Sequence, residues 1–296
     1  MRYSISHDTL YEYSEPVSLS QQLLHLTPRP IERQRCLEHR LEVSPEPARR
    51  NDRLDSFGNP VSVLEFDRPH RRLVISASTL VEVEPRLQAP DLRDSPPWDE
   101  AVAALSYRAG RQLDPGMLEA VAFRVESPFV RVKRVLADYA RDCFPPGAPL
   151  LAGCDALMHK IHREFTFDAD ATHIATPMLE VLKKKRGVCQ DYAHIMLGAL
   201  RSLGLSARYI SGYLLTHPPP GKPRLIGADA SHAWVEVRCP RQRWIAFDPT
   251  NKIIPDTEHI ALAWGRDFGD VSPQRGVILG GGRHEIKVKV TVTPVR

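Results

Sequence analysis

Three residues that lie far apart in the chain have the types needed for nucleophilic catalysis. Cys189 lies in the run GVCQDYAH (187–194), His232 in SHAW (231–234) and Asp248 in FDPTN (247–251). A thiolate attacks a carbonyl carbon when an imidazole serves as its base and a carboxylate orients that imidazole. The three residues therefore predict an enzyme that attacks acyl groups, with Cys189 as nucleophile, His232 as base and then acid, and Asp248 as orienter.

The cysteine is predicted to begin a helix and to face inward. Positions 189, 192, 193, 196, 197, 200 and 203 carry Cys, Tyr, Ala, Met, Leu, Leu and Leu, which is the spacing of one apolar helical face. Gly187 and Gly204 are typical of the turns at the two ends. The free amides and the dipole of a first helical turn favour a negative thiolate. The basic run 183–186 adds positive potential, and is best explained as a solvated helix end, with steering of an anionic substrate as the alternative.

The histidine and the aspartate are predicted to lie on adjacent strands. Residues 231–238 alternate like a strand, and Asp248 follows the apolar segment 243–247, which Pro249 ends. Each catalytic candidate also has a simpler interpretation alone: a cysteine in an apolar stripe packs, a strand histidine is merely hydrogen-bonded, and an aspartate before proline forms a turn. The occurrence of all three together favours catalysis.

The strings GVCQDYAH, LRSLGLSARYISGYL, SHAWVEV and WIAFDPTN resemble the bacterial transglutaminase-like enzymes of the papain-like cysteine protease superfamily, especially those with an added N-terminal β domain. The similarity extends to EFTF (164–167), to Thr176-Pro177 and to the tail at 265–277. It is looser over residues 1–85, where SFGN (56–59) is the best landmark. It implies a Cys, His, Asp triad in that chain order.

Several residues near the triad are candidates for substrate binding, oxyanion stabilisation or support of the site. The amide of Cys189 is the natural first oxyanion donor, and the resemblance implies a second donor around 166–168. The supporting candidates are Phe167, Gln190, Asp191, His194 and Trp234. We expect Asp191 and His194 on the polar side of the helix, paired with each other or with a loop. Phe167 and Phe268 stand where many relatives are expected to carry tyrosine.

We expect an α+β protein of two domains. Residues 1–86 read as an N-terminal antiparallel β sandwich or barrel, and residues 98–296 as a papain-like, transglutaminase-type core with a helical layer on an antiparallel sheet. A proline-containing linker at about 87–97 joins them. Strands are expected at 207–215, 231–238, 243–248 and 284–293. The loop 216–223, rich in proline, is a candidate cleft wall or lid, with an inert connection as the equal alternative.

Composition and charge exclude several other classes of protein. The 296 residues carry a net charge of only +4 without a basic stripe interleaved with aromatics, so we expect no nucleic-acid partner. No apolar run is long enough to span a membrane, and the first residues lack an apolar signal core, so we expect a cytoplasmic protein with no membrane partner. The five cysteines show no close pairing. His159 and His162 share a helix edge but lack further ligands, so we expect both to be surface histidines. We expect no metal and no cofactor.

The chemistry fixes the nucleophile but leaves the acyl acceptor open. We expect a peptide or protein substrate and a thioester acyl-enzyme that water resolves, as in a peptidase or amidase. A transglutaminase that passes the acyl group to an amine is the first alternative. A non-catalytic module that holds a peptide in an inert cleft is the second. The oligomeric state is left open by the sequence.

Overall fold

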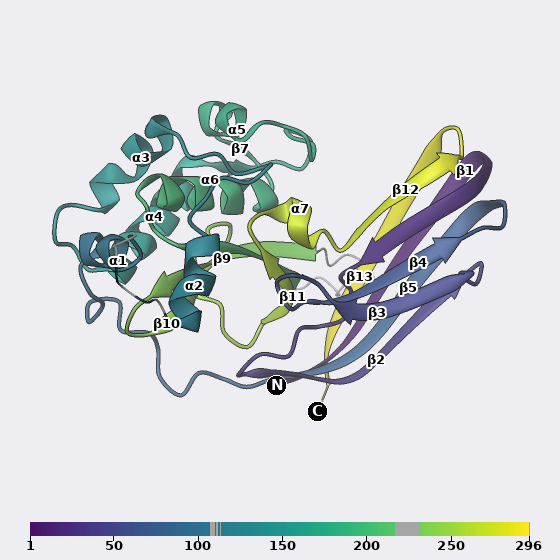
Figure 1. Ribbon diagram of the computed structural model, residues 1–296, viewed down its shortest axis with the longest axis horizontal. Coiled ribbons are helices and arrows are strands. Elements are labelled where there is room, and N and C mark those ends of the chain that lie inside the picture. Colours follow the sequence, from purple (N-terminus) through teal and green to yellow (C-terminus); the bar gives the residue numbers. More distant parts are fainter. Residues whose placement is uncertain (107–109, 111, 113, 217–230, 296) are drawn as a thin grey trace, which may run out of the picture.

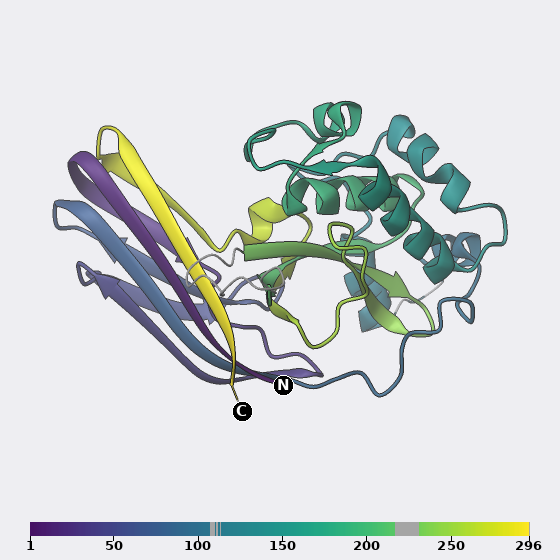
Figure 2. The same ribbon diagram turned by 180° about the vertical axis from the view of Figure 1, so that it is seen from behind.

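The computed structural model describes residues 1–106, 110, 112, 114–216 and 231–295, and shows a β domain beside an α+β domain (Figure 1). Residues 217–223 of the proposed lid loop lie outside the described residues. Within the described part of the chain, no helix is long and apolar enough to cross a membrane. Both termini lie at the same end of the molecule, near the junction of the two domains (Figures 1 and 2).

The β domain is built around one long strand, β1 (Arg2–Leu24). The first half of β1 pairs with β5 (His70–Val83) and its second half with β4 (Pro60–Phe66), all antiparallel. The strands β2 (Gln34–Ser44) and β3 (Arg49–Leu54) extend the two halves outward. Alternating apolar residues of β1, β4 and β5 pack into one core, as expected of an antiparallel sheet with one buried face.

Two strands from the C-terminal tail complete this sheet. β12 (Gln274–Gly280) and β13 (His284–Val295) both pair antiparallel with β1, and β13 runs alongside it in Figure 2. The expected boundary, which gave all of 98–296 to the catalytic domain, therefore needs a correction at the tail. The apolar alternation of 286–292 predicts a strand, but it carries no information on which sheet accepts it.

The α+β domain has a helical layer on a four-stranded antiparallel sheet of order β10-β9-β8-β11. The strands are β8 (Ala207–Leu214), β9 (Ser231–Cys239), β10 (Arg243–Phe247) and β11 (His259–Gly265). The helices are α1 (Trp98–Ala104), α2 (Pro115–Ala122), α3 (Arg134–Ala140) with the 3₁₀ turn Arg141–Cys143, α4 (Leu150–Glu164), α5 (Met178–Lys184), α6 (Cys189–Ser202) and α7 (Phe268–Val271). A short parallel pair, β6 (Thr166–Phe167) and β7 (Arg186–Gly187), precedes α6.

Helix α6 lies at the centre of this domain. It packs on β8 and β9 on one side and on α3, α4 and α5 on the other, an arrangement visible in Figure 1. All residues from 191 to 201 are consequently buried. The sequence predicted a single apolar face, but the enclosing elements bury the polar positions of the helix as well.

The β domain covers the outer edge of the four-stranded sheet. β11 is an edge strand, and the side-chain amide of Gln34 donates to Ala261 O at 2.7 Å and accepts from Ala261 N at 2.8 Å. Asn59 does the same to Trp264, with distances of 2.8 and 2.9 Å. Both amides are almost completely buried. Unpaired strand edges are a liability in water and in association, and here two side chains satisfy this edge.

The same junction contains a shared apolar core. Tyr3, Ile5, Val81 and Val83 of the β domain pack with residues of β8, β11 and β13. The SFGN turn presents Asn59 to β11, with Gly58 at φ 74°, a conformation that a residue with a Cβ rarely adopts. The two domains are therefore held together by both apolar packing and directed hydrogen bonds.

Replacing Gln34 by alanine should lower the free energy of unfolding by about 1–3 kcal/mol, because the buried N–H and C=O of Ala261 each lose a partner. Urea denaturation measures the change. The matched control is Gln88→Ala in the exposed linker, which should leave the stability within about 0.5 kcal/mol. Equal stability of the two variants would contradict the role of Gln34 as an edge cap.

Candidate active site

The candidate nucleophile begins the central helix. Cys189 is the first residue of α6 and is partly buried. The first amides of an α-helix have no intrahelical acceptor. The Cys189 amide is therefore placed to donate to an oxyanion, and the helix dipole favours negative charge at the sulfur.

Asp191 fixes the first turn of this helix. Its Oδ2 accepts a hydrogen bond from the Val188 amide at 2.9 Å and from the Thr172 hydroxyl at 2.7 Å. A Cβ at Gly187 would lie only 2.4 Å from the same oxygen, so this position has room for glycine alone. Asp191 thus caps the helix, and of its two expected partners, His194 or a loop, it binds the loop residue Thr172.

His232 and Asp248 meet at the ends of neighbouring strands. His232 is the second residue of β9, Asp248 follows β10, and His232 Nε2 lies 2.7 Å from Asp248 Oδ2. Because Nε2 faces the carboxylate, Nδ1 is the nitrogen left for Cys189, whose side chain lies close enough to raise the pKa of this imidazole. The structure thus brings Cys189, His232 and Asp248 together, with the histidine between the other two.

The carboxylate of Asp248 is completely buried and accepts five hydrogen bonds from the residues that the structure describes. Oδ2 accepts from His232 Nε2, from His259 Nε2 at 3.0 Å and from Asn251 Nδ2 at 2.8 Å. Oδ1 accepts from the Thr250 and Asn251 amides at 3.0 and 3.2 Å. A buried carboxylate is stable only when donors replace water in this way.

The environment favours a charged pair of His232 and Asp248. Burial alone lowers the pKa of His232, but its bonds to Asp248 and Cys189 and the charges of both outweigh burial and raise the pKa to about 10. Burial alone raises the pKa of Asp248, yet the donors His232 and His259 hold that pKa well below its usual range. His232 is therefore an imidazolium at neutral pH, which favours the thiolate of Cys189.

Trp234 forms a wall beside the histidine. Its ring stacks on His232 with ring centres 6.2 Å apart and meets His259 edge-on at 5.1 Å. A Cβ at Gly212 would lie 2.5 Å from the Trp234 ring, so the glycine makes room for the indole. Trp234 is 3% exposed, and it keeps water from one side of the two imidazoles.

The remaining predicted residues have varied positions. His194 is buried behind the site rather than on a polar face: it accepts a hydrogen bond from the Phe268 amide at 3.2 Å and stacks on Phe129. Burial lowers the pKa of His194 to about 4, so it is neutral. Gln190 is half-buried next to the nucleophile, and Phe167 is 58% exposed on β6.

The segment expected to hold a second oxyanion donor is largely committed to β6–β7 pairing. The amide of Thr166 donates to Lys185 O and that of Asp168 to Gly187 O, each at 2.9 Å. By the alternation of a parallel pair, the Phe167 amide faces the other way. Two of the three expected donors are thus used inside the protein.

Three residues of this site were missed by the sequence reasoning. His259 and Asn251 both donate to Asp248, and His162 on α4 donates through Nδ1 to Thr250 O at 2.9 Å, which holds the turn after Asp248. His162 was expected to be a surface histidine. The apolar segment that follows His259 was the available signal, because it predicts a strand whose first residue lies near the sheet end.

One cluster among the described residues has ligand atoms close enough to hold a metal ion. The nitrogens of His232 and His259 and an oxygen of Asp248 lie within 4.8 Å of one another. The contacts of 2.7 and 3.0 Å are ordinary N–H to carboxylate hydrogen bonds. Hydrogen bonds therefore account for the close approach of these three side chains.

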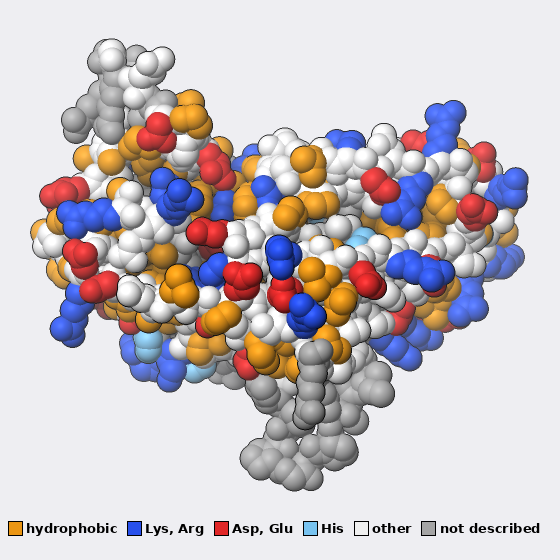
Figure 3. All heavy atoms as spheres, turned by 90° about the horizontal axis from the view of Figure 1, so that it is seen from below, with side chains coloured by type: hydrophobic (Ala, Val, Ile, Leu, Met, Phe, Trp, Pro, Cys, Tyr) orange, Lys and Arg blue, Asp and Glu red, His pale blue; other side chains and the backbone are white. Residues whose placement is uncertain are grey.

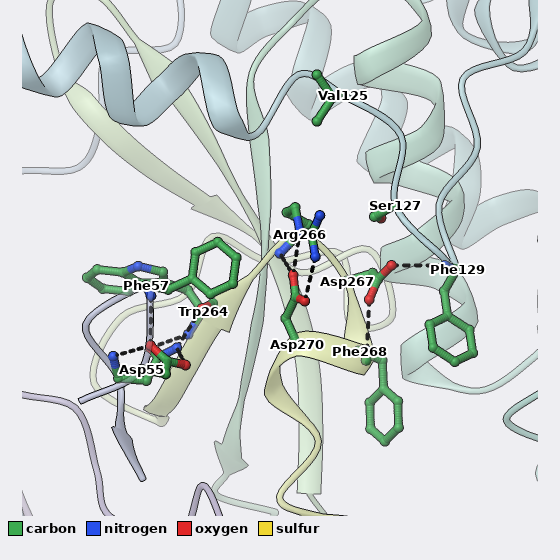
Figure 4. Close-up of polar contacts among 12 residues, drawn as sticks. Asp55, Phe57, Val125, Ser127, Phe129, Trp264, Arg266, Asp267, Phe268 and Asp270 are labelled. Carbon is green, nitrogen blue, oxygen red and sulfur yellow. Dashed lines mark hydrogen bonds and ion pairs between the residues drawn. The ribbon is translucent and has the colours of Figure 1, made fainter. Parts of the chain in front are cut away.

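The tail motif GRDFGD (265–270) supports the back of α6. Asp267 accepts from the Phe129 amide at 2.9 Å and the Gly269 amide at 2.8 Å, and Arg266 binds Asp270 through two nitrogens (Figure 4). Arg201 of α6 donates to Arg266 O at 2.6 Å. Phe268 packs against Tyr209 and Phe129, so this position lies behind the helix.

Fold and site together define a papain-like α+β protein, in which a cysteine at a helix N-terminus faces a histidine and an aspartate on a sheet. Residues 3–82 match the bacterial transglutaminase-like N-terminal region, and residues 137–249 match the transglutaminase-like superfamily. The chain belongs to this bacterial transglutaminase-like family.

Relatives extend over the whole chain. An uncharacterized protein of Mycobacterium tuberculosis is 40% identical over 99% of this chain and 93% of its own length. A protein-glutamine gamma-glutamyltransferase of Pseudomonas aeruginosa is 32% identical over 127 residues, which are 42% of this chain and 19% of that protein. The crystal structure of a "Putative Cysteine Protease" from Cytophaga hutchinsonii has a TM-score of 0.74 at 19% identity, over 100% of this chain and 92% of that one.

Replacing Asp191 by alanine should lower the free energy of unfolding by about 1–2 kcal/mol, since the Val188 amide and the Thr172 hydroxyl lose their acceptor. Denaturation in urea measures the change. The control is Asp170→Ala, which removes an exposed aspartate from the loop that carries Thr172. It should leave the free energy of unfolding unchanged. An Asp191→Ala variant with the unfolding free energy of the wild type would contradict the capping role.

The His232 imidazole should lose its proton only near pH 10. Because Asp248 is the main group that raises this pKa, Asp248→Asn should move the titration to lower pH. The ¹⁵N signals of labelled histidine, followed by NMR from pH 5 to 11, measure both values. A wild-type midpoint near the ordinary value of 6.5 would contradict the charged pair.

Proposed function

We propose that this protein is a cysteine-dependent enzyme that hydrolyses amide bonds of peptides or proteins through a thioester acyl-enzyme. The observation that carries the proposal is the contact of His232 with both Cys189 and the buried Asp248. A protein that merely held a peptide would have no need of an imidazolium beside a half-exposed thiol.

The reaction follows from the positions of the protons. The Cys189 thiolate attacks the amide carbonyl, and the resulting oxyanion accepts the Cys189 N–H. His232 passes its Nδ1 proton to the leaving amine, and the C–N bond breaks to give the thioester. His232 then takes a proton from water as the water attacks the thioester, the C–S bond breaks, and the acid is released with the thiolate and imidazolium restored. Asp248 accepts the hydrogen bond from His232 Nε2–H throughout, so that the ring keeps its orientation.

Transfer of the acyl group to an amine is the second candidate. The matched part of the Pseudomonas aeruginosa relative, a protein-glutamine gamma-glutamyltransferase, supports it. The chemistry is the same up to the thioester, and only the acceptor differs. We favour hydrolysis because Cys189 is only partly buried and water resolves a thioester unless the site excludes it.

Surface charge agrees with a peptide substrate rather than a polyanion. On the face shown in Figure 3, basic and acidic side chains are interspersed and form no continuous basic stripe. The net charge is +4. This supports a neutral or mixed-charge partner.

Replacing Cys189 by alanine should lower amide cleavage by at least about 10³-fold, because the nucleophile is lost. The control is Cys143→Ala, which removes a second half-buried thiol, one that contacts Asp142. It should retain activity. Glutamine-containing peptide libraries, incubated with and without a fluorescent amine, are analysed by mass spectrometry. Free acid supports hydrolysis, and amine-labelled product supports transfer.

Thiol labelling tests whether the protein is an enzyme at all. Iodoacetamide should label Cys189 faster than Cys36 or Cys143 below pH 8 if the thiolate is favoured. Uniformly slow labelling, together with no turnover of any peptide, would leave the non-catalytic peptide-binding module as the better reading.

A further inference from the structure

We propose that His259 is a positioning residue, which holds the Asp248 carboxylate against His232 and links the active site to the β domain. The inference rests on the proposed function for its meaning in catalysis, and on geometry for the contact itself. His259 Nε2 lies 3.0 Å from Asp248 Oδ2, the same oxygen that His232 Nε2 contacts at 2.7 Å.

The contact fixes the protons on His259. A carboxylate oxygen only accepts hydrogen bonds, so His259 must carry a proton on Nε2. Burial lowers the pKa of His259, although the Asp248 carboxylate opposes this effect. His259 is therefore a neutral donor, whereas His232 is an imidazolium. One carboxylate thus binds two histidines that have different charges and different tasks.

The surroundings of His259 leave it little freedom. The side chain is 2% exposed, and Trp234 meets its ring edge-on at 5.1 Å. The charged or titratable groups that act on it are Asp248, His232 and Glu258. A donor held in this way restricts the rotation of the carboxylate, so that Oδ2 remains directed at His232.

The backbone that carries His259 is held from outside the catalytic domain. His259 is the first residue of β11, whose outer edge binds Gln34 at Ala261 and Asn59 at Trp264. Asn251, the third donor to Oδ2, is exposed and comes from the same turn as Asp248. Among the three donors to this oxygen, His259 alone lies on the strand that the β domain covers. The β domain therefore contributes to the site through this strand.

Two substitutions separate the hydrogen bond from the packing. His259→Leu removes the donor, whereas His259→Gln keeps an N–H at the same number of bonds from Cα. His159→Gln, on an exposed part of α4, is the control. The rate of Cys189 alkylation by iodoacetamide is measured from pH 3 to 9 by peptide mass spectrometry, which requires no substrate.

We expect the leucine variant to lose reactivity at a higher pH than the wild type. Without the His259 donor the pKa of Asp248 rises, so that falling pH neutralises the carboxylate earlier and the His232 imidazolium and the thiolate lose support. Amide cleavage should fall by about tenfold to a hundredfold, and the glutamine variant should recover most of both losses.

A purely structural role would give another result. The proposal is overturned if His259→Leu lowers the unfolding midpoint but the alkylation rate of Cys189 falls at the same acid pH as in the wild type. Should the leucine variant not fold, ¹⁵N NMR of the wild type decides, because a His259 ring that lacks a proton on Nε2 at neutral pH also overturns it. A different result would separate the two proposals. If the wild type cleaves no amide, but the leucine variant loses Cys189 alkylation at a higher pH than the wild type, the proposed function fails and the role of His259 stands.

Discussion

The structure depends on the burial of one negative charge. The Asp248 carboxylate has no exposed surface, and it lies where the ends of β9, β10 and β11 meet. A carboxylate in such a place costs several kcal/mol unless charged or strongly polar donors surround it. Five donors do so here, and two of them are histidines on other strands. The need to satisfy this group explains why residues so distant in sequence have converged.

The arrangement divides the site into two separately held parts. Asp191 and Thr172 hold the nucleophile at the start of α6, whereas the sheet and the β domain hold the imidazole and carboxylate. The contact between Cys189 and His232 is therefore set by how α6 packs on β8 and β9. Since residues 191–201 of α6 are all buried, that packing is rigid. The buried Arg201, which binds the backbone of Arg266 at the far end of the helix, adds a second fixed point.

Much of the catalytic core follows from local sequence patterns, and the parts that do not are long-range. The apolar spacing after Cys189 predicts α6, and the alternation around His232 predicts β9, because both signals lie within one element. The sequence left the partner of Asp191 open between His194 and a loop, because the choice depends on how the neighbours of α6 pack, and the partner is the loop residue Thr172. The tail strand was assigned to the wrong sheet because its partner β1 lies at the other end of the chain. The apolar strand that follows His259 is a local signal for its position, but it does not reveal the contact with Asp248, since a histidine before an apolar strand is common in packed proteins.

The edge strand β11 shows why the β domain is more than an attachment. An isolated catalytic domain would leave the polar backbone at Ala261 and Trp264 without the partners that Gln34 and Asn59 provide, and exposed edge groups pair with water or with other chains. Such a strand would fray from its outer side. His259 stands at its first residue, where fraying begins, so that any loosening reaches Asp248 directly. The same hydrogen bonds that stabilise the domain junction therefore also determine how firmly the carboxylate is held against His232.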